Sequence, residues 1–390
     1  MKIKKEFKLA DLIFKISPNI ILGYYVTSRL GQYAGEWGSK FMLIVDPILK
    51  ESNTSQKVSQ ALSDRKIDFF TFDEISMLAD TEVLSVALRL ARDACVHGVI
   101  ACGGARTLAL AKAVCALYHE THDLYDFVDG CNPSVAPLPL ICLPSTMRDV
   151  FLFTDRTPVV DARSSKISLI KTQNGLCKSV IWDPALSVGL TEKQNSSMTL
   201  ETLSLAIESY MSQKSTFFSD MLIEKSLELL SYGMDGSQSL TITTPKELLL
   251  TQGGCMASLG AASSSLGACS LISLSVNSRF NISRSLTSSI LLPYIIEDGA
   301  KFQASRLAKI AKILKTCEKD ASDIDAAASL AESIRTRIAQ VNLPSRLKDL
   351  SLSIEQLSLA VEDCGTLDLI NSLPRSMTTD DLFEIVKQAY

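Results

Sequence analysis

The first half of the chain alternates short apolar runs with stretches in which apolar residues recur every three or four positions. Short apolar runs predict buried strands, and the second pattern predicts amphipathic helices. This alternation is typical of an open, mostly parallel sheet with helices on both faces. The predicted strands are 19–25, 40–46, 66–72, 97–104, 138–144, 167–172 and 179–184, and the predicted helices are 26–38, 81–94 and 107–120.

From Thr191 onward the pattern is almost wholly helical. Thr191 and Gln194 have the spacing of a capping box, in which each side chain satisfies a free backbone N–H, so we predict a helix start there. Pro344 and Pro374 mark breaks between later helices. We therefore predict a nucleotide-binding type of α/β domain over 1–187 and an all-α domain over 188–390. The longest helical patterns cover 219–233, 254–275, 288–314 and 381–390.

Composition and charge exclude several classes of function. The net charge is −4, and no basic run is interleaved with aromatic residues, so nothing favours a nucleic-acid partner. No apolar run is long enough to span a membrane, and residues 1–16 lack the apolar core of a signal peptide. The ten cysteines are scattered and include no CxxC pair. We expect reduced thiols in a cytoplasmic protein.

A glycine turn follows the fourth predicted strand and opens a helix. In "GGARTLALAK", Gly103 and Gly104 allow backbone N–H groups to approach a phosphate, and the helix dipole favours an anion there. Such turns also occur without any ligand. The turn alone therefore leaves both phosphate binding and a purely structural role open.

A second feature is the predicted helix over residues 199–213. Leu200, Leu203, Ile207 and Tyr210 recur at helical spacing, which predicts one buried face. Glu201 stands four residues before a leucine, and residues at that spacing lie on one face of a helix. An acid and a histidine placed in this way would grip a metal ion, but this chain offers an acid and a leucine.

Several stretches together resemble the iron-containing (group III) alcohol dehydrogenases, a family that shares its fold with glycerol dehydrogenase and dehydroquinate synthase. The resemblance covers nearly the full length, with the stretches in the family's order. It implies a Rossmann-like nucleotide-binding domain beside a helical metal-binding domain, an NAD(P)-linked oxidoreductase scaffold, and a homodimer. The stretches that carry it are 20–47, 99–114, 137–146, 180–186, 205–212, 281–294, 342–363 and 373–389.

The family's metal is held by one aspartate and three histidines, and this chain keeps none of them. A further family histidine near the reacting carbon matches a leucine here. A transition metal needs three or four nitrogen, oxygen or sulfur donors at about 2.0–2.3 Å. We therefore expect neither iron nor zinc, and the catalytic residues stay unassigned. The four ligand positions and the further histidine position match, in that order, Glu201, Leu205, Ser270, Arg284 and Leu274.

The nucleotide-binding positions are altered less completely. By resemblance, an acid that faces the cofactor ribose matches Asp46, and a cofactor-side lysine matches Lys166. Arginines stand in both phosphate loops and could bind a phosphate themselves. NAD or NADP binding therefore stays open, as does binding of a small anion near the glycine turn within reach of Arg148. The candidate cofactor residues are Asp46, Gly103, Gly104, Arg106, Thr146, Arg148 and Lys166.

Three functional hypotheses follow. The first is a divergent family member without metal-dependent dehydrogenase activity, a pseudoenzyme or binding protein. The second is an active, metal-independent NAD(P)-linked alcohol or aldehyde oxidoreductase. The third is a lyase-type enzyme in which Arg284 replaces the metal as electrophile, with Tyr294 and Lys166 as candidate bases. At the former metal position we expect Glu201 and Arg284 to form a buried ion pair, because either charge alone would be costly to bury.

Overall fold

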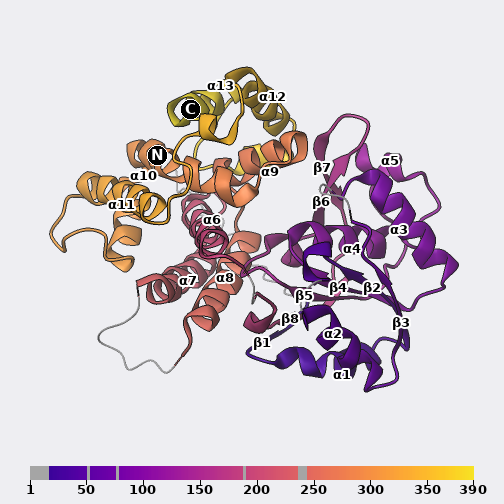
Figure 1. Ribbon diagram of the computed structural model, residues 1–390. Helices are drawn as coiled ribbons and strands as arrows, with labels where there is room; N and C mark the ends of the chain where they lie inside the picture. Colours follow the sequence, from indigo (N-terminus) through magenta and orange to yellow (C-terminus); the bar gives the residue numbers. More distant parts are fainter. Residues whose placement is uncertain (1–16, 51–52, 76–78, 188–189, 236–243) are drawn as a thin grey trace, which may run out of the picture.

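The computed structural model describes residues 17–50, 53–75, 79–187, 190–235 and 244–390. Within these ranges a half that contains all the strands precedes a half built of helices, and the two halves lie side by side (Figure 1). This architecture confirms the predicted fold class, an α/β half followed by an all-α half. The predicted domain boundary between residues 187 and 188 falls at the edge of the described ranges, so it stays a prediction.

The main sheet has six parallel strands in the order β1-β8-β5-β4-β2-β3. Strands β4 and β5 are buried along their whole length, and β2 is buried after its first residue, because helices cover both faces of a parallel sheet. The edge strands β1 and β3 are more exposed. The strands are β1 (Asn19–Leu22), β2 (Lys40–Val45), β3 (Asp68–Phe72), β4 (Gly98–Gly103), β5 (Leu140–Pro144) and β8 (Cys177–Trp182).

Alternate residues of each central strand enter different cores. In β2, Met42 and Ile44 pack with helices α3 and α4, whereas Phe41, Leu43 and Val45 pack with α1 and α2. This alternation follows from the two-residue repeat of a strand. Figure 1 shows the two pairs of helices on opposite faces of the sheet. The helices of this half are α1 (Leu30–Gly35), α2 (Asn53–Ser63), α3 (Thr81–Asp93), α4 (Ala105–Leu117) and α5 (Leu124–Val128).

Two details of the α/β half differ from the sequence prediction. The stretch 167–172 does form a strand, β7 (Lys166–Lys171), but it pairs in an antiparallel hairpin with β6 (Arg156–Asp161) outside the main sheet. The sequence did not predict β6, which carries a proline, nor α2, whose composition is mostly polar. Both elements are held by tertiary packing more than by local propensity.

The helical half is organised around α6. Thr191 and Gln194 form the predicted capping box at its start. The helix packs against α7, α8, α9 and α10, and from Thr199 on nearly every residue is buried, not only one face. The helices are α6 (Glu192–Met211), α7 (Phe217–Asp235), α8 (Lys246–Ser263), α9 (Ala268–Phe280), α10 (Arg284–Ile313), α11 (Asp323–Gln340), α12 (Ile354–Gly365) and α13 (Thr379–Ala389).

The helical pattern over 254–275 is broken in the structure. Helix α8 ends at Ser263 and α9 begins at Ala268, with a bend of 100° between them. A β-carbon on Gly267, the N-cap residue of α9, would lie 2.4 Å from the carboxyl carbon of Glu208, so glycine is required at this close approach. Among the described residues no single helix is long and apolar enough to cross a membrane, and α8 with α9 passes that test only as a bent pair.

The two halves share one apolar core at their junction. Met147, Val150 and Phe151, which follow β5, belong to the same buried cluster as the apolar residues of α6 and α10. On α8, a β-carbon at Gly254 would lie 2.0 Å from the carbonyl oxygen of Met147, so the helix touches the backbone of this loop. The loop that follows β5 is therefore fixed against the helical half.

Candidate functional site

Helices α6, α9 and α10 bring together the five positions that the resemblance assigns to the metal site, which are called the former metal position below. Glu201 and Leu205 come from α6, Ser270 and Leu274 from α9, and Arg284 is the first residue of α10. All five line one small cavity of about 20 Å³. The remaining lining residues are Arg148, Val150, Phe151 and Leu266.

Glu201 forms its ion pair with Arg148 and not with Arg284. The guanidinium of Arg148 contacts the Glu201 carboxylate across the junction of the two halves, and the two side chains are only 12% and 13% exposed. The prediction that a buried ion pair occupies this position is therefore right about the carboxylate and wrong about the cation. Arg284 lies on the same cavity but makes no ion pair with Glu201.

The loop that carries Arg148 is held at several points. The hydroxyl of Ser258 on α8 accepts a hydrogen bond from the N–H of Asp149 (3.0 Å), and the indole N–H of Trp182 donates to the carbonyl of Thr146 (2.7 Å). The Thr146 hydroxyl donates to the carbonyl of Arg148 itself (3.1 Å). These contacts fix the backbone from which the Arg148 side chain reaches Glu201.

Arg284 differs from Arg148 in having no partner. In the part of the chain that the structure describes, its guanidinium makes neither a hydrogen bond nor an ion pair. Burial lowers its pKa, and the nearby charge of Asp149 opposes this shift. Burial, and then the charge of Arg284, lowers the pKa of Arg148 to about 9, while the contact with Glu201 favours its charged form.

Ser270, at a former ligand position, is hydrogen-bonded to Glu208. Its hydroxyl and its backbone N–H donate to the carboxylate of Glu208 at 2.9 and 3.1 Å, and the N–H of Cys269 donates to the same carboxylate at 2.5 Å. Glu208 thus caps the first turn of α9, where free N–H groups and the helix dipole favour an acid. Burial nevertheless raises its pKa to about 7.

The residues at the former metal position do not fit a transition metal. Such an ion needs three or four donor atoms. Here the carboxylate of Glu201 is paired with a cation, the hydroxyl of Ser270 donates to Glu208, and Arg284 would repel a metal ion. Within the described ranges no group of three or more histidine, cysteine, aspartate or glutamate side chains could hold a metal ion.

On the nucleotide side, the glycine turn opens helix α4 as predicted. The acid at the ribose position, Asp46, is however already hydrogen-bonded to other side chains of the chain. A β-carbon on Gly103 would lie 2.7 Å from the β-carbon of Asp46, so this glycine is required by close approach. The Asp46 carboxylate accepts hydrogen bonds from Arg106 (2.8 Å) and Thr107 (3.1 Å). Burial would raise the pKa of Asp46, but the hydrogen bond from Arg106 and its charge outweigh burial and lower it.

Lys166 lies apart from both loops. Its ammonium group forms an ion pair with the buried Asp363 of α12 at 3.3 Å, and Asp363 also pairs with Arg279 of α9. It lines neither the small cavity nor the neighbouring one described next. The structure thus separates Lys166 from Arg148, with which the resemblance had grouped it.

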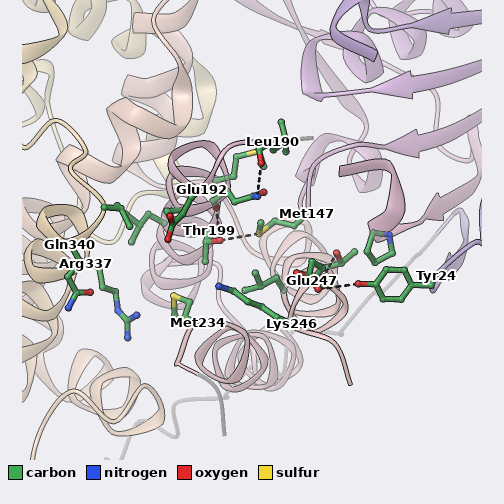
Figure 2. Close-up of a pocket in the computed structure, with 18 residues that line it drawn as sticks. Tyr24, Met147, Leu190, Glu192, Thr199, Met234, Lys246, Glu247, Arg337 and Gln340 are labelled. Carbon is green, nitrogen blue, oxygen red and sulfur yellow. Dashed lines mark hydrogen bonds between the residues drawn. The ribbon is translucent and has the colours of Figure 1, made fainter. Parts of the chain in front are cut away.

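A second cavity, of about 180 Å³, joins the glycine turn to the former metal position. Its lining residues are Ala105, Thr146, Met147, Arg148, Met198, Glu201, Ser283, Arg284 and Ser285. A larger cavity of about 620 Å³ lies beyond it, between Tyr24 and the helical half (Figure 2). Met147 and Met198 line both of these cavities, so they are adjacent parts of the space between the two halves.

The larger cavity has no evident catalytic arrangement. The hydroxyl of Tyr24 donates to Glu247 (3.2 Å), Arg337 pairs with Asp235, and Thr199 donates to the sulfur of Met147 (3.8 Å), as Figure 2 shows in part. Of its four charged lining residues, Arg337 is in an ion pair and Glu247 is hydrogen-bonded to Tyr24, whereas Glu192 and Lys246 form no ion pair within the described ranges. We find the more distinctive chemistry in the 180 Å³ cavity.

Family models match almost the whole chain. Residues 17–184 match the model described as "Iron-containing alcohol dehydrogenase", and residues 196–390 match "Fe-containing alcohol dehydrogenase family, C-terminal". The chain belongs to the iron-containing alcohol dehydrogenase family. The resemblance inferred from the sequence is thereby confirmed.

Individual relatives of this dehydrogenase-family chain are distant. The probable alcohol dehydrogenase EutG of Escherichia coli is 26% identical over 346 residues, 86% of this chain and 84% of that protein. A crystal structure of 1,3-propanediol oxidoreductase has a TM-score of 0.88 at 18% identity, covering 97% of this chain and 100% of that one. Sulfoacetaldehyde reductase from Bifidobacterium kashiwanohense, solved with NAD⁺, has a TM-score of 0.81 at 18% identity, covering 97% and 99%.

The sequence analysis did not predict several residues that lie at or beside the site. Asp149, Ser283 and Ser285 lie at or beside the arginines, and Glu208 holds Ser270. A signal for Glu208 was present, because it stands seven residues after Glu201, two turns along the same helix. Nothing in the local sequence pairs Arg148 with Glu201.

Proposed function

We propose that this chain is a divergent member of the iron-containing alcohol dehydrogenase family that carries out no metal-dependent dehydrogenase reaction and acts as a binding protein. The observation that carries the proposal is the ion pair between Arg148 and Glu201 at the former metal position. In the family reaction the metal stabilises developing charge on the substrate oxygen. Leu205 and Leu274, at two of the histidine positions, cannot take this role.

The alternative of a metal-independent oxidoreductase has less support. Sulfoacetaldehyde reductase, a relative by fold, was solved with NAD⁺, which keeps nucleotide binding in consideration. In this chain, however, the acid at the ribose position is engaged by Arg106 and Thr107. A dinucleotide would have to displace the arginine before its ribose hydroxyls could reach Asp46.

The lyase alternative needs a base beside Arg284. The candidates Tyr294 and Lys166 do not line the 180 Å³ cavity: Tyr294 stacks against Arg335 (5.4 Å), and Lys166 pairs with Asp363. The unpartnered guanidinium of Arg284 is the one observation in favour of this alternative. An electrophile without a nearby base favours binding over turnover.

The proposal is tested by assaying NADH- and NADPH-linked reduction of short aldehydes, and oxidation of the matching alcohols. The protein is assayed after chelator treatment and again after incubation with Fe²⁺ or Zn²⁺. We expect no turnover above the blank in either state. Turnover that appears with metal and disappears with chelator would overturn the proposal, and turnover without metal would support the oxidoreductase alternative. Calorimetric titration with NAD and NADP tests the cofactor residues separately.

A further inference from the structure

The 180 Å³ cavity has an excess of positive charge over negative charge. Arg148, Arg284 and the carboxylate of Glu201 line it, and outside the lining the carboxylate of Asp149 interacts with both arginines and with Lys112. The group therefore carries one positive charge in excess. A buried charge without a counter-charge is costly. The excess falls on Arg284, because Arg148 is paired with Glu201.

The start of helix α10 adds further donors on the same side. Ser283 is the N-cap residue, but its side chain makes no capping hydrogen bond. Its hydroxyl instead shares a hydrogen bond with that of Ser285 (2.8 Å), which also contacts Ser197 (3.1 Å). The first N–H groups of a helix are unsatisfied within the helix, and the dipole makes them attractive to an anion.

An unsatisfied buried donor lies beside them. The Nε–H of Arg148 is buried and has no hydrogen-bond partner, although the end of its guanidinium contacts Glu201. Buried polar groups in native proteins nearly always have a partner, and each exception calls for an explanation. An anion in the adjoining cavity would lie close to both arginines.

We propose that this cavity binds a small organic monocarboxylate, held at the start of α10 by Arg284. The planar fork of arginine suits a two-point contact with a carboxylate. The apolar walls, Met147 and Met198, would receive a short carbon chain. An apolar cavity of about 150 Å³ holds a benzene molecule, so the volume of about 180 Å³ fits a chain of a few carbons and not a dinucleotide.

This inference rests on the proposed function in one respect, because it takes the former metal position to be filled by side chains. The choice of measurement distinguishes failure of this inference from failure of the proposed function. Binding is measured by isothermal titration calorimetry of the full chain in a buffer that contains a chelator, so that neither metal nor catalysis enters the readout. Failure of the carboxylates to bind a chain that holds no metal would overturn the inference and leave the proposed function standing.

The titrants are acetate, propionate and butyrate, with 1-butanol and inorganic phosphate as comparison probes. We expect the carboxylates to bind at one site per chain, with affinity rising from acetate to butyrate as methylene groups enter the apolar part, and 1-butanol not to bind. Silence for all three carboxylates at millimolar concentration would overturn the inference. Binding of phosphate in preference to them would overturn the assignment to a carboxylate.

Variants locate the site. Arg284→Met should weaken butyrate binding at least about tenfold, because its charge-assisted hydrogen bonds to the carboxylate are lost. Arg284→Lys, which keeps the charge but not the fork, should lose less. The matched control Arg335→Met, an arginine of α11 outside the cavity, should bind like the parent chain. Equal affinity in Arg284→Met and the parent would contradict the inference, and the lysine variant answers the question if the methionine variant fails to fold.

A last variant tests the role of the ion pair. Glu201→Gln releases Arg148 from its partner and should tighten butyrate binding several-fold, because a second guanidinium becomes available to the ligand. A purely structural role for Arg284 would not produce this gain. Unchanged or weaker binding in a folded Glu201→Gln protein would contradict the proposed arrangement.

Discussion

The carboxylate of Glu201 on α6 is paired with the guanidinium of Arg148, which reaches it from the loop after β5 in the other half of the molecule. The contact joins the two halves at the position that the resemblance assigns to the family's metal. The two side chains neutralise each other's charge. Both charges are nearly buried, so the pair depends on the fixed geometry of the loop and the helix.

A double-mutant cycle measures this dependence. Arg148→Met or Glu201→Leu alone should lower the free energy of unfolding by about 3–5 kcal/mol, because each leaves a buried charge without its partner. The double variant should lose much less than the sum of the two. Urea denaturation of the four proteins provides the values. As a matched control, the exposed pair Lys225 and Glu228 should show a coupling below about 1 kcal/mol. Additive losses at Arg148 and Glu201 would contradict a buried pair.

The fold could be predicted from the sequence because its signals are local. Strands such as β2, β4 and β5 are continuous apolar runs, and the capping box of α6 marks a helix start without any tertiary information. The bend between α8 and α9 was missed because the serine-rich segment keeps apolar residues at helical spacing on both sides of it. At the start of α9, Gly267 closely approaches Glu208, a contact distant in sequence that local periodicity does not reveal.

The candidate site could be predicted only in part for a related reason. Resemblance assigns positions on the backbone, and the structure places Glu201, Leu205, Ser270, Leu274 and Arg284 around one cavity as that assignment implies. It does not say where long side chains point. Arg148 crosses to Glu201, Arg106 turns to Asp46, and Lys166 turns away to Asp363, so each cation takes a partner that no local pattern specifies. The roles of these residues stay predictions.

Gly254 of α8 tests how firmly the Arg148 loop is fixed. In Gly254→Ala the new β-carbon would lie 2.0 Å from the carbonyl oxygen of Met147, and no side-chain rotation relieves a clash with backbone. We expect a loss of about 1–3 kcal/mol in the free energy of unfolding. The control Gly35→Ala, where the nearest atom is 3.9 Å away, should be neutral or slightly stabilising. Equal thermal stability of the two variants would show that the loop yields freely.

The buried carboxyl group of Glu208 should make the free energy of unfolding depend on pH. Burial raises its pKa to about 7 in the folded chain, whereas an exposed glutamate titrates near about 4.3. Between these values the folded state holds a proton that the unfolded state has released, so the free energy of unfolding falls as pH rises toward 7. The fall attributable to Glu208 is at most about 4 kcal/mol, at about 1.4 kcal/mol per unit of pKa shift.

Denaturation curves of the parent chain and Glu208→Gln between pH 5 and pH 8 measure this contribution. The stability of the parent relative to the variant should decrease with rising pH and level off above about pH 7. Parallel pH profiles for the two proteins would mean that Glu208 titrates alike in the folded and unfolded chains.

Substitution of the buried Lys112 should destabilise the fold through the loss of hydrogen bonds. Its buried ammonium donates hydrogen bonds to the carbonyl oxygens of Phe151, Thr154 and Arg156, at 2.5, 2.5 and 3.0 Å, and burial lowers its pKa to about 8. Lys112→Met leaves these carbonyls without their donor and should cost at least about 3 kcal/mol in the free energy of unfolding. Thermal denaturation checks it, and a change below about 1 kcal/mol would mean that the segment finds other donors.

The replacement of the metal site by side chains is tested most directly by metal stoichiometry. The purified chain is incubated with Fe²⁺ or Zn²⁺, passed through a desalting column, and analysed by inductively coupled plasma mass spectrometry. A variant that restores the family's ligand types, Glu201→Asp, Leu205→His, Ser270→His and Arg284→His, with Arg148→Gly to remove the competing cation, serves as the positive control. We predict that the parent chain retains well below one metal ion per chain while the restored variant retains about one. A parent chain that retains one metal ion, and loses it on Glu201→Ala, would contradict the account.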